Sequence, residues 1–194
     1  MSTALQVSWK EGGLRLLAQE PTDDEIRRHA AVLAAWVNDP HNTSMLANTQ
    51  ALTPDEVVAQ YAEMRAEGAR VFFLYVDGEL VGDADLRNVT PPVAEFAIMV
   101  GPRGTQARGL GTRFTTMVHA LAFGELALTT VYLSIVPRNE AARRCYLKVG
   151  YVEDGSPEAR RYTDEETDVA MSLSREAFLR KHGESVKGMR VGRR

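Results

Sequence analysis

Residues 101–114 read GPRGTQARGLGTRF and combine glycines and arginines where an apolar stretch gives way to a helical pattern. The first N–H groups of a helix have no partner within the helix, and the helix dipole adds positive potential there, so phosphate binds well at such a place. Gly109 and Gly111 leave these amides uncovered. Arg108 adds positive charge, and Thr112 adds a hydroxyl. The pattern therefore indicates a phosphate-binding loop, with a plain glycine-rich turn as the alternative.

Two other phosphate loops fit this segment poorly. A mononucleotide loop of the G-x-x-x-x-G-K-[ST] kind needs a lysine, and no lysine lies between Gly101 and Phe114. A dinucleotide loop needs the pattern G-x-G-x-x-G, but Phe114 stands where the third glycine is required. Neither kind of nucleotide site is predicted here.

The segment before the loop, residues 93–100, alternates as a β-strand does. One face of this strand carries Glu95, Ala97 and Met99. The other face carries Phe96, Ile98 and Val100. A carboxylate on one face of the strand that leads into the loop is a candidate for proton transfer.

The elements around this strand and loop follow from periodicity and from capping residues. Apolar residues recur at helical spacing between 109 and 124, a strand is predicted at 129–136, and a short helix runs from Asn139 to Gly150. The further predicted elements are a strand at 13–18, helices at 22–38 and 53–68, two strands around the Asp77-Gly78 turn, a turn near Pro91-Pro92, and two closing strands joined at 164–167. This order predicts an α/β (α+β) fold, a sheet with helices on its faces.

Two motifs at the expected separation resemble the GCN5-related N-acetyltransferase (GNAT) superfamily. Residues 106–111, QARGLG, match the family pattern Q/R-x-x-G-x-G/A. Residues 139–151 match the second pattern, N-x-x-A-x-x-x-Y-x-K-x-G-[FY]. The resemblance covers roughly residues 70–174 and looks closest to the subgroup that acetylates ribosomal-protein N-termini and polyamines.

The resemblance implies a mixed, mostly antiparallel central sheet of about seven strands, with helices on both faces and a splayed pair of central strands. It implies a single N-acetyltransferase domain over 1–174. Residues 175–194 hold seven Lys/Arg against two Glu, and we expect them to form a basic, frayed C-terminal extension.

The resemblance also implies acetyl-CoA as the cosubstrate, with its phosphates on the backbone amides of the loop. The implied cofactor-binding residues are Gln106, Ala107, Arg108, Gly109, Leu110, Gly111 and Thr112 in the loop and Ile98, Met99, Val100 and Asn139 along the pantetheine arm. The amide of Ile98 or Met99 would polarise the thioester carbonyl. No metal is expected.

Transfer of an acetyl group to an amine needs two proton movements. The departing thiolate needs a proton donor, and Tyr146 matches the general-acid tyrosine of the family pattern. The attacking amine needs a base, acting directly or through a water, and Glu95 is the candidate. Cys145 points elsewhere on the helix, about 100° around from Tyr146, so a core position is expected for it rather than an acetyl-cysteine intermediate.

The acceptor is expected to be a small-molecule amine or a peptide N-terminus, lying between the two N-terminal helices and the strand ends. Polyamines, antibiotic amines, sugar amines and peptide N-termini stay open. A polyamine site would need several carboxylates, and the nearest in sequence, in residues 23–25 and 55–56, are of the kind that usually caps helices. A non-catalytic acetyl-CoA-binding sensor or scaffold is the alternative function.

The composition excludes several other classes of protein. The net charge is −3 and the pI is about 5.9, so no nucleic-acid partner is expected. The single cysteine, Cys145, allows no internal disulfide. The chain has no apolar run long enough for a signal peptide or a membrane span, so a cytoplasmic protein is expected, with a homodimer as a possible assembly.

Overall fold

The structure is a computed structural model that describes residues 4–45, 50–101 and 109–194. Within these residues, the strands form one nine-stranded sheet in the order β7-β8-β6-β5-β4-β3-β2-β1-β9, in which only β5 and β6 pair in parallel. The strands are β1 (Leu5–Glu11), β2 (Leu14–Gln19), β3 (Arg70–Val76), β4 (Glu79–Thr90), β5 (Val93–Val100), β6 (Thr130–Ile135), β7 (Val152–Glu153), β8 (Val169–Ser174) and β9 (Met189–Arg193). The mixed, mostly antiparallel sheet is confirmed, with two strands more than the resemblance implied.

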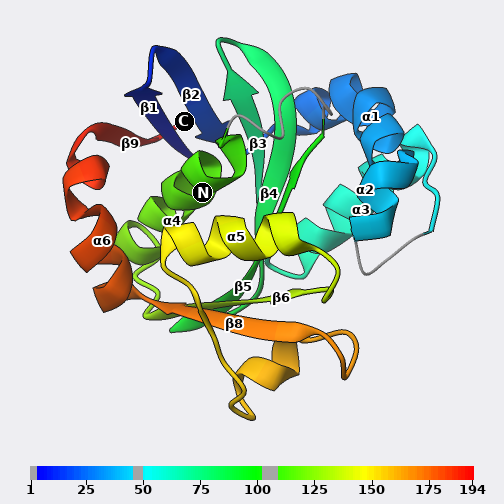
Figure 1. The fold of residues 1–194 in the computed structure, drawn as a ribbon. Helices are drawn as coiled ribbons and strands as arrows, with labels where there is room; N and C mark the ends of the chain where they lie inside the picture. The colour runs from blue at the N-terminus through cyan, green and yellow to red at the C-terminus, as the bar shows by residue number, and fades with distance from the viewer. Residues whose placement is uncertain (1–3, 46–49, 102–108) are drawn as a thin grey trace.

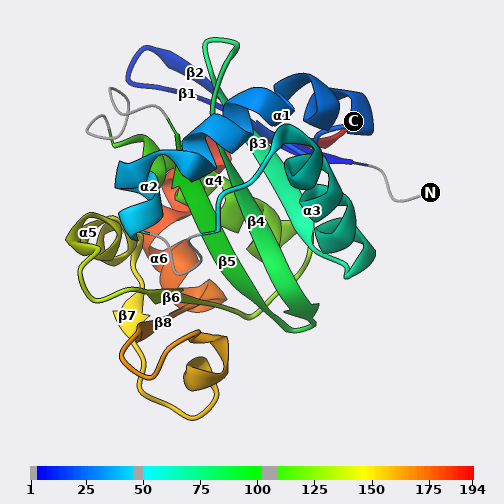
Figure 2. The same ribbon diagram turned by 90° about the vertical axis from the view of Figure 1, so that its right-hand side faces the viewer.

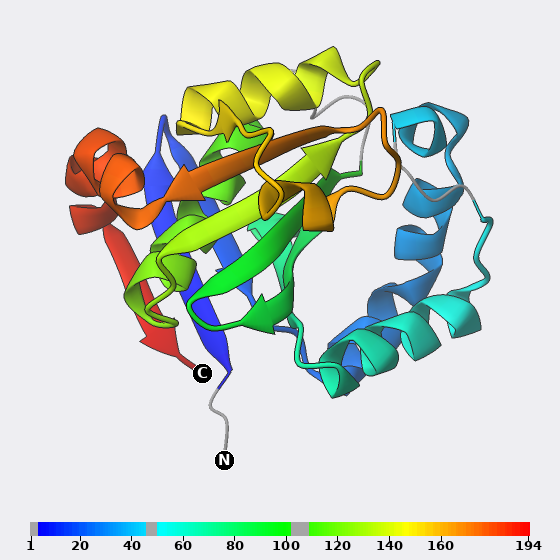
Figure 3. The ribbon, with the colours of Figure 1, turned by 90° about the horizontal axis from the view of Figure 1, so that it is seen from below.

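In the described residues, six α-helices cover the two faces of the sheet. They are α1 (Asp23–Asn38), α2 (Pro40–Met45), α3 (Pro54–Ala66), α4 (Leu110–Gly124), α5 (Glu140–Val149) and α6 (Arg175–Lys187), with a short 3-10 helix at Ala159–Tyr162. Figures 1 and 2 show α1 and α3 on one side of the central strands and α4 and α6 on the other. Seen from below, the same two groups of helices stand apart across the sheet (Figure 3).

Each face has its own hydrophobic core. The apolar stripe of α4 predicted from its helical spacing is fully buried, including Phe114, Met117 and Leu121, and packs against the sheet together with Phe178 of α6. On the opposite face, Leu33 of α1 and Tyr61 of α3 pack onto β3. Helices therefore cover the centre of the sheet on both sides.

The predicted local signals are confirmed at several element ends. Thr22 and Thr53 cap α1 and α3 with capping boxes, in which each threonine oxygen accepts from the backbone N–H three residues on. Asp77 and Gly78 have φ of 51° and 91°, as a tight two-residue hairpin requires. These interactions lie within a few residues, which is why periodicity and turn chemistry found them.

The ends of the sheet differ from the prediction in three ways. β1 was not predicted, although residues 5–11 alternate between buried and more exposed positions. Residues 175–194 are not frayed: they form α6 and β9, and β9 pairs with β1 from Leu5 to Trp9. The closing strands are joined by more than a turn at 164–167, because β7 has two residues and the 3-10 helix intervenes.

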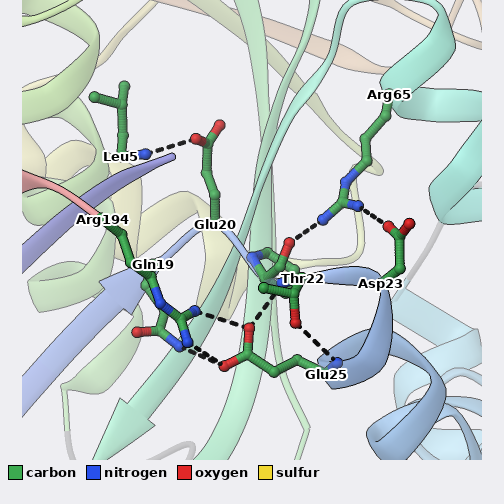
Figure 4. A network of polar contacts seen from close by, with 9 residues as sticks. Leu5, Gln19, Glu20, Thr22, Asp23, Glu25, Arg65 and Arg194 are labelled. Carbon is green, nitrogen blue, oxygen red and sulfur yellow. Dashed lines mark hydrogen bonds and ion pairs between the residues drawn. The ribbon is translucent and has the colours of Figure 1, made fainter. Parts of the chain in front are cut away.

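The C-terminal residue is tied to the first helix by a carboxylate. Arg194 donates two hydrogen bonds to Glu25, of 2.8 and 2.9 Å (Figure 4). Near by, Arg65 donates to Asp23 at 2.7 Å and so connects α3 to α1. The Arg194 guanidinium is the main reason that the pKa of Glu25 falls from 4.5 to about 2. The last residues of the chain thereby help to hold α1 against the sheet.

Replacing Arg194 with Ala is expected to destabilise the fold by about 1 kcal/mol or less at pH 7, because the pair is partly exposed to solvent. The folded pKa of Glu25 lies below its unfolded value, so the contribution is complete above about pH 5 and is lost as the pH falls toward 2. Urea midpoints measured between pH 3 and pH 7 test this. Arg193→Ala is the neighbouring control, and an effect of Arg194→Ala that is the same at every pH would contradict the assignment.

Candidate active site

The strands β5 and β6 separate after three residue pairs. They are in register only from Val93↔Thr130 to Glu95↔Tyr132. Beyond Glu95, β5 continues along β4 as far as the pair Gly82↔Val100, while β6 continues along β8. The splayed pair of central strands predicted from the resemblance is confirmed, and a gap opens between β5 and β6.

The direction of the β5 amides decides which residues can use this gap. Gly101 N–H donates to the carbonyl of Val81 on β4 at 2.9 Å. Because backbone groups alternate along a strand, the amide of Met99 also faces β4, and the amides of Ile98 and Val100 face the gap. The sequence suggested the amide of either Ile98 or Met99 as the donor to the thioester carbonyl. The geometry favours Ile98 as this backbone donor, whereas Met99 lines the cavity with its side chain.

The N-terminus of α4 is free of a side-chain cap. Gly109 occupies the N-cap position with φ of 71° and, lacking a side chain, makes no side-chain hydrogen bond to the first amides of the helix. A Cβ at Gly109 would meet no atom of the described residues within 4 Å. Such a helix start suits a phosphate. Gln106, Ala107 and Arg108 lie outside the described residues.

The next loop residues anchor this helix start. The Leu110 side chain is fully buried in the core, so Leu110 can contact a ligand in the gap only through its backbone. The Thr112 hydroxyl contacts the Cys145 sulfur at 3.5 Å, and a Cβ at Gly111 would lie 3.3 Å from the same sulfur. Burial raises the pKa of the Cys145 thiol. A packing position for Cys145 agrees with the expectation that it is not a nucleophile.

A cavity of roughly 310 Å³ lies at the gap. Several elements wall it: α1, α2 and α3 on one side, β4, β5 and β6 along the sheet, and α5 on the other side. The residues predicted from sequence that line it are Glu95, Ile98, Met99, Asn139 and Tyr146. A larger hollow of roughly 1040 Å³ beside α1 and the β1–β2 hairpin contains none of the predicted site residues, so the smaller cavity is the candidate site.

Tyr146 lies deep in this cavity and is held by aromatic neighbours. Its exposed fraction is 6%, and its ring packs against Phe96 and Tyr151. Tyr151 in turn donates its O–H to Nε2 of buried His119 at 2.5 Å, while His119 Nδ1 donates to the carbonyl of Thr115. Burial raises the pKa of Tyr146 well above its usual value, so the phenol keeps its proton at physiological pH.

Glu95 is half-buried at the end where β5 and β6 still pair. Burial raises the pKa of its carboxyl, with opposition from the charge of Arg87. Its Oε2 accepts a hydrogen bond from Asn88 at 2.7 Å, and Arg87 is its partner across β4 and β5. Glu95 therefore lines the cavity from the first half of β5, near the turn that joins β4 and β5.

Asn139 has partners on both atoms of its amide. Its oxygen caps α5 by accepting from Ala142 N–H at 3.0 Å, and its nitrogen donates to the Met45 carbonyl at 3.2 Å. The helix-cap role is confirmed, and the second bond joins α5 to α2 at the rim of the cavity. A contact of Asn139 with pantetheine stays a prediction.

Four of the five carboxylates that line the cavity were not identified from the sequence. They are Asp83 and Asp85 on β4 and Asp164 and Asp168 near β8, beside Glu95. The acids considered instead, in residues 23–25 and 55–56, cap α1 and α3 or pair with arginine. The sequence does contain a signal for the carboxylates of β4. Every second residue from 83 to 87 is charged, although this strand lies between buried strands.

Two kinds of feature are absent from the described part of the chain. Within residues 4–45, 50–101 and 109–194, no helix has the length and apolarity needed to cross a bilayer. Across the same ranges, no group of three or more His, Cys, Asp or Glu is arranged to hold a metal ion.

Known proteins share this arrangement. The acetyltransferase (GNAT) domain family matches residues 15–152. The spermidine N(1)-acetyltransferase of Escherichia coli K12 is 26% identical over 133 residues, which are 68% of this chain and 66% of that protein, just under two thirds of the relative's length.

Two solved structures show the same fold at lower identity. The aminoglycoside acetyltransferase AAC(6')-Ib in complex with ribostamycin and coenzyme A has a TM-score of 0.72 at 22% identity, covering 85% of this chain and 96% of that one. Mycobacterium smegmatis RimJ in complex with CoA-disulfide has a TM-score of 0.70 at 17% identity, covering 96% and 95%. With the splayed strands, the uncapped helix start and the family match over more than half of its length, the chain belongs to the GNAT acetyltransferase family.

Proposed function

We propose that this protein transfers an acetyl group from acetyl-CoA to a primary amine by direct attack within a ternary complex. The observation that carries the proposal is the gap between β5 and β6, with the uncapped start of α4 at one end and Tyr146 in the cavity. This arrangement can hold a thioester and an amine together, and such positioning lowers a reaction barrier substantially.

The described residues fit coenzyme A. The amides of Leu110, Gly111 and Thr112 begin α4 without a side-chain cap and would bind the diphosphate. Ile98 presents its backbone groups to the gap and would bind the pantetheine arm as an added strand does, and Val100 lies on the same side of β5. The Ile98 amide would also polarise the thioester carbonyl.

Two side chains would move the protons. Tyr146 would donate to the departing sulfur, since its phenol stays protonated in its buried position. A carboxylate of the cavity would accept a proton from the ammonium form of the acceptor; Glu95, as expected from the sequence, is one candidate. An amine must be neutral to attack, because the ammonium has no free electron pair.

The acceptor is best matched by an amine with more than one positive charge. Five carboxylates line the cavity, and Arg87 is the one cationic side chain among the described residues that line it. Matched relatives are named for spermidine and aminoglycosides, which carry several amines. A peptide N-terminus stays the alternative acceptor.

The test has two stages. Coenzyme A at millimolar concentration should raise the melting temperature, because a ligand that binds only the folded state stabilises it. Acetyl-CoA is then incubated with spermidine, kanamycin or a peptide with a free N-terminus, and thiol release is followed. Thermal stabilisation without thiol release for any amine would favour the sensor or scaffold. No stabilisation would contradict the proposal.

A further inference from the structure

Asp83 is a half-buried residue whose carboxylate has one oxygen in a hydrogen bond. It lies on β4, on the face covered by α3, and lines the cavity. The Tyr61 hydroxyl donates to its Oδ2 at 2.6 Å. Its Oδ1 is buried and has no hydrogen-bond partner among the residues that the structure describes. A buried carboxylate oxygen without a donor is costly, so this atom is suited to a donor brought by a ligand.

The neighbouring carboxylate on β4 is occupied. Arg87 binds both oxygens of Asp85 at 2.6 Å each. Both oxygens of Asp85 therefore already have a charged donor inside the protein. Asp83 makes no comparable pair within the described part of the chain.

Asp83 is also close to the amide that faces the gap. It pairs across the strands with Met99, one residue from Ile98. Directly opposed side chains in a sheet have Cβ atoms about 5 Å apart. Glu95 stands three residues from Ile98 along β5, which at about 3.4 Å per residue is about 10 Å away. In the sheet, the backbone of Asp83 is therefore nearer to that of Ile98 than the backbone of Glu95 is.

The environment of Asp83 suits a group that exchanges a proton near neutral pH. Burial raises the pKa of its carboxyl from 3.8 to about 6, and the Tyr61 hydrogen bond opposes this rise. The charged groups that face it are Asp85, which raises the pKa, and Arg87, which lowers it. Glu95 of β5 lines the same cavity. Catalytic bases work best with a pKa near the operating pH.

We propose that Asp83, held by Tyr61, is the carboxylate that takes the proton from the acceptor's ammonium. This inference rests on the proposed acetyl transfer and names the base at that site. The ammonium gives one proton to Asp83, and the freed electron pair forms the N–C bond at the thioester carbonyl. The C–S bond breaks, and the sulfur takes a proton from Tyr146. The nitrogen then gives a second proton to the Tyr146 oxygen, which restores the phenol. Asp83 releases its proton to solvent.

The test compares Asp83→Asn with Glu95→Gln, using spermidine or whichever amine of the panel the native protein acetylates fastest. At pH 7, Asp83→Asn should lower kcat/KM for the amine by about 100-fold or more, the usual effect of losing a general base. Glu95→Gln should cause a smaller loss. Both variants should keep the thermal shift with coenzyme A, because neither residue lies at the start of α4.

The pH dependence separates proton transfer from simple positioning. Without a base, Asp83→Asn must use the neutral amine, whose fraction rises tenfold per pH unit below the amine's pKa. The ratio of the native kcat/KM to that of Asp83→Asn should therefore fall about tenfold per pH unit between pH 7 and pH 9. A deficit that is equal at both pH values would show that Asp83 only positions the acceptor and would overturn the proposal.

Tyr61→Phe is a second variant that keeps the carboxylate. Because the Tyr61 hydrogen bond lowers the pKa of Asp83, its loss should move the acidic limb of kcat/KM to higher pH. If the acidic limb of kcat/KM stayed at the same pH in Tyr61→Phe, the role of Asp83 would be contradicted. The same holds if Glu95→Gln lowered kcat/KM and Asp83→Asn did not. If the native protein binds coenzyme A but acetylates no amine of the panel, the proposed function itself fails.

Discussion

Replacing Tyr146 with Phe is expected to lower kcat by about 100-fold or more while leaving coenzyme A binding intact. The substitution removes only the hydroxyl, whose proton the departing sulfur would take, and losses of 10²- to 10⁴-fold are usual for a general acid. The ring keeps its packing against Phe96 and Tyr151, so the fold should be little affected. Thiol release at saturating amine and acetyl-CoA measures kcat, and a thermal shift with coenzyme A measures binding.

Tyr75→Phe is the matched control, because Tyr75 lies on β3 beside the larger hollow and not in the candidate site. This variant should retain the native kcat. If Tyr146→Phe also kept its turnover, water or another donor would protonate the sulfur and the role of Tyr146 would be refuted. A loss of coenzyme A binding together with activity would instead indicate that the hydroxyl supports the site's shape.

Replacing Gly82 with Ala is expected to damage stability and activity together. A Cβ at this position would lie 2.1 Å from the carbonyl oxygen of Met99 and 3.1 Å from Cα of Val100. Both atoms are backbone, so β4 and β5 must move apart at the place where β5 lines the gap. Overpacking of this kind costs about 1–3 kcal/mol, and a displacement of about 1 Å at a reacting group can cost about 100-fold in rate.

Thermal melts and kcat/KM measure both effects of Gly82→Ala. The melting temperature should fall by several degrees, since about 1 kcal/mol corresponds to roughly 2–4 °C in a chain of this size. Gly183→Ala in α6 is the control: a Cβ there would meet no described atom within 4 Å, and alanine stabilises a helix by about 0.5–1 kcal/mol. If Gly82→Ala kept the native melting temperature and kcat/KM, the prediction would be wrong and β4 and β5 would tolerate a wider spacing.

Much of the fold was predictable because its signals are local. The capping boxes at Thr22 and Thr53 connect residues three apart, and the tight turn at Asp77-Gly78 needs only its own two residues. The glycine-rich loop before α4 and the second family motif are likewise continuous runs of sequence. Hydrophobic periodicity then determined the buried face of α4.

The edge of the sheet could not be predicted in this way. Residues 189–193 have a polar, glycine-containing sequence with little strand character of their own. They form β9 because β1, almost the whole chain away, offers an unpaired edge, and because Arg194 binds Glu25. Pairing between distant segments leaves no periodic signal in either of them.

By itself, the sequence determined most of the central elements and the membership of Tyr146 and Glu95 in one site, and it predicted a phosphate-binding loop before α4, because short-range spacing carries that information. Only the tertiary structure decided that Ile98 and not Met99 turns its amide to the gap, and that Asp83 lies one residue pair away with an oxygen to spare. Those facts depend on strand register and on Tyr61 reaching across from α3, and register is a property of two strands together that neither strand encodes alone.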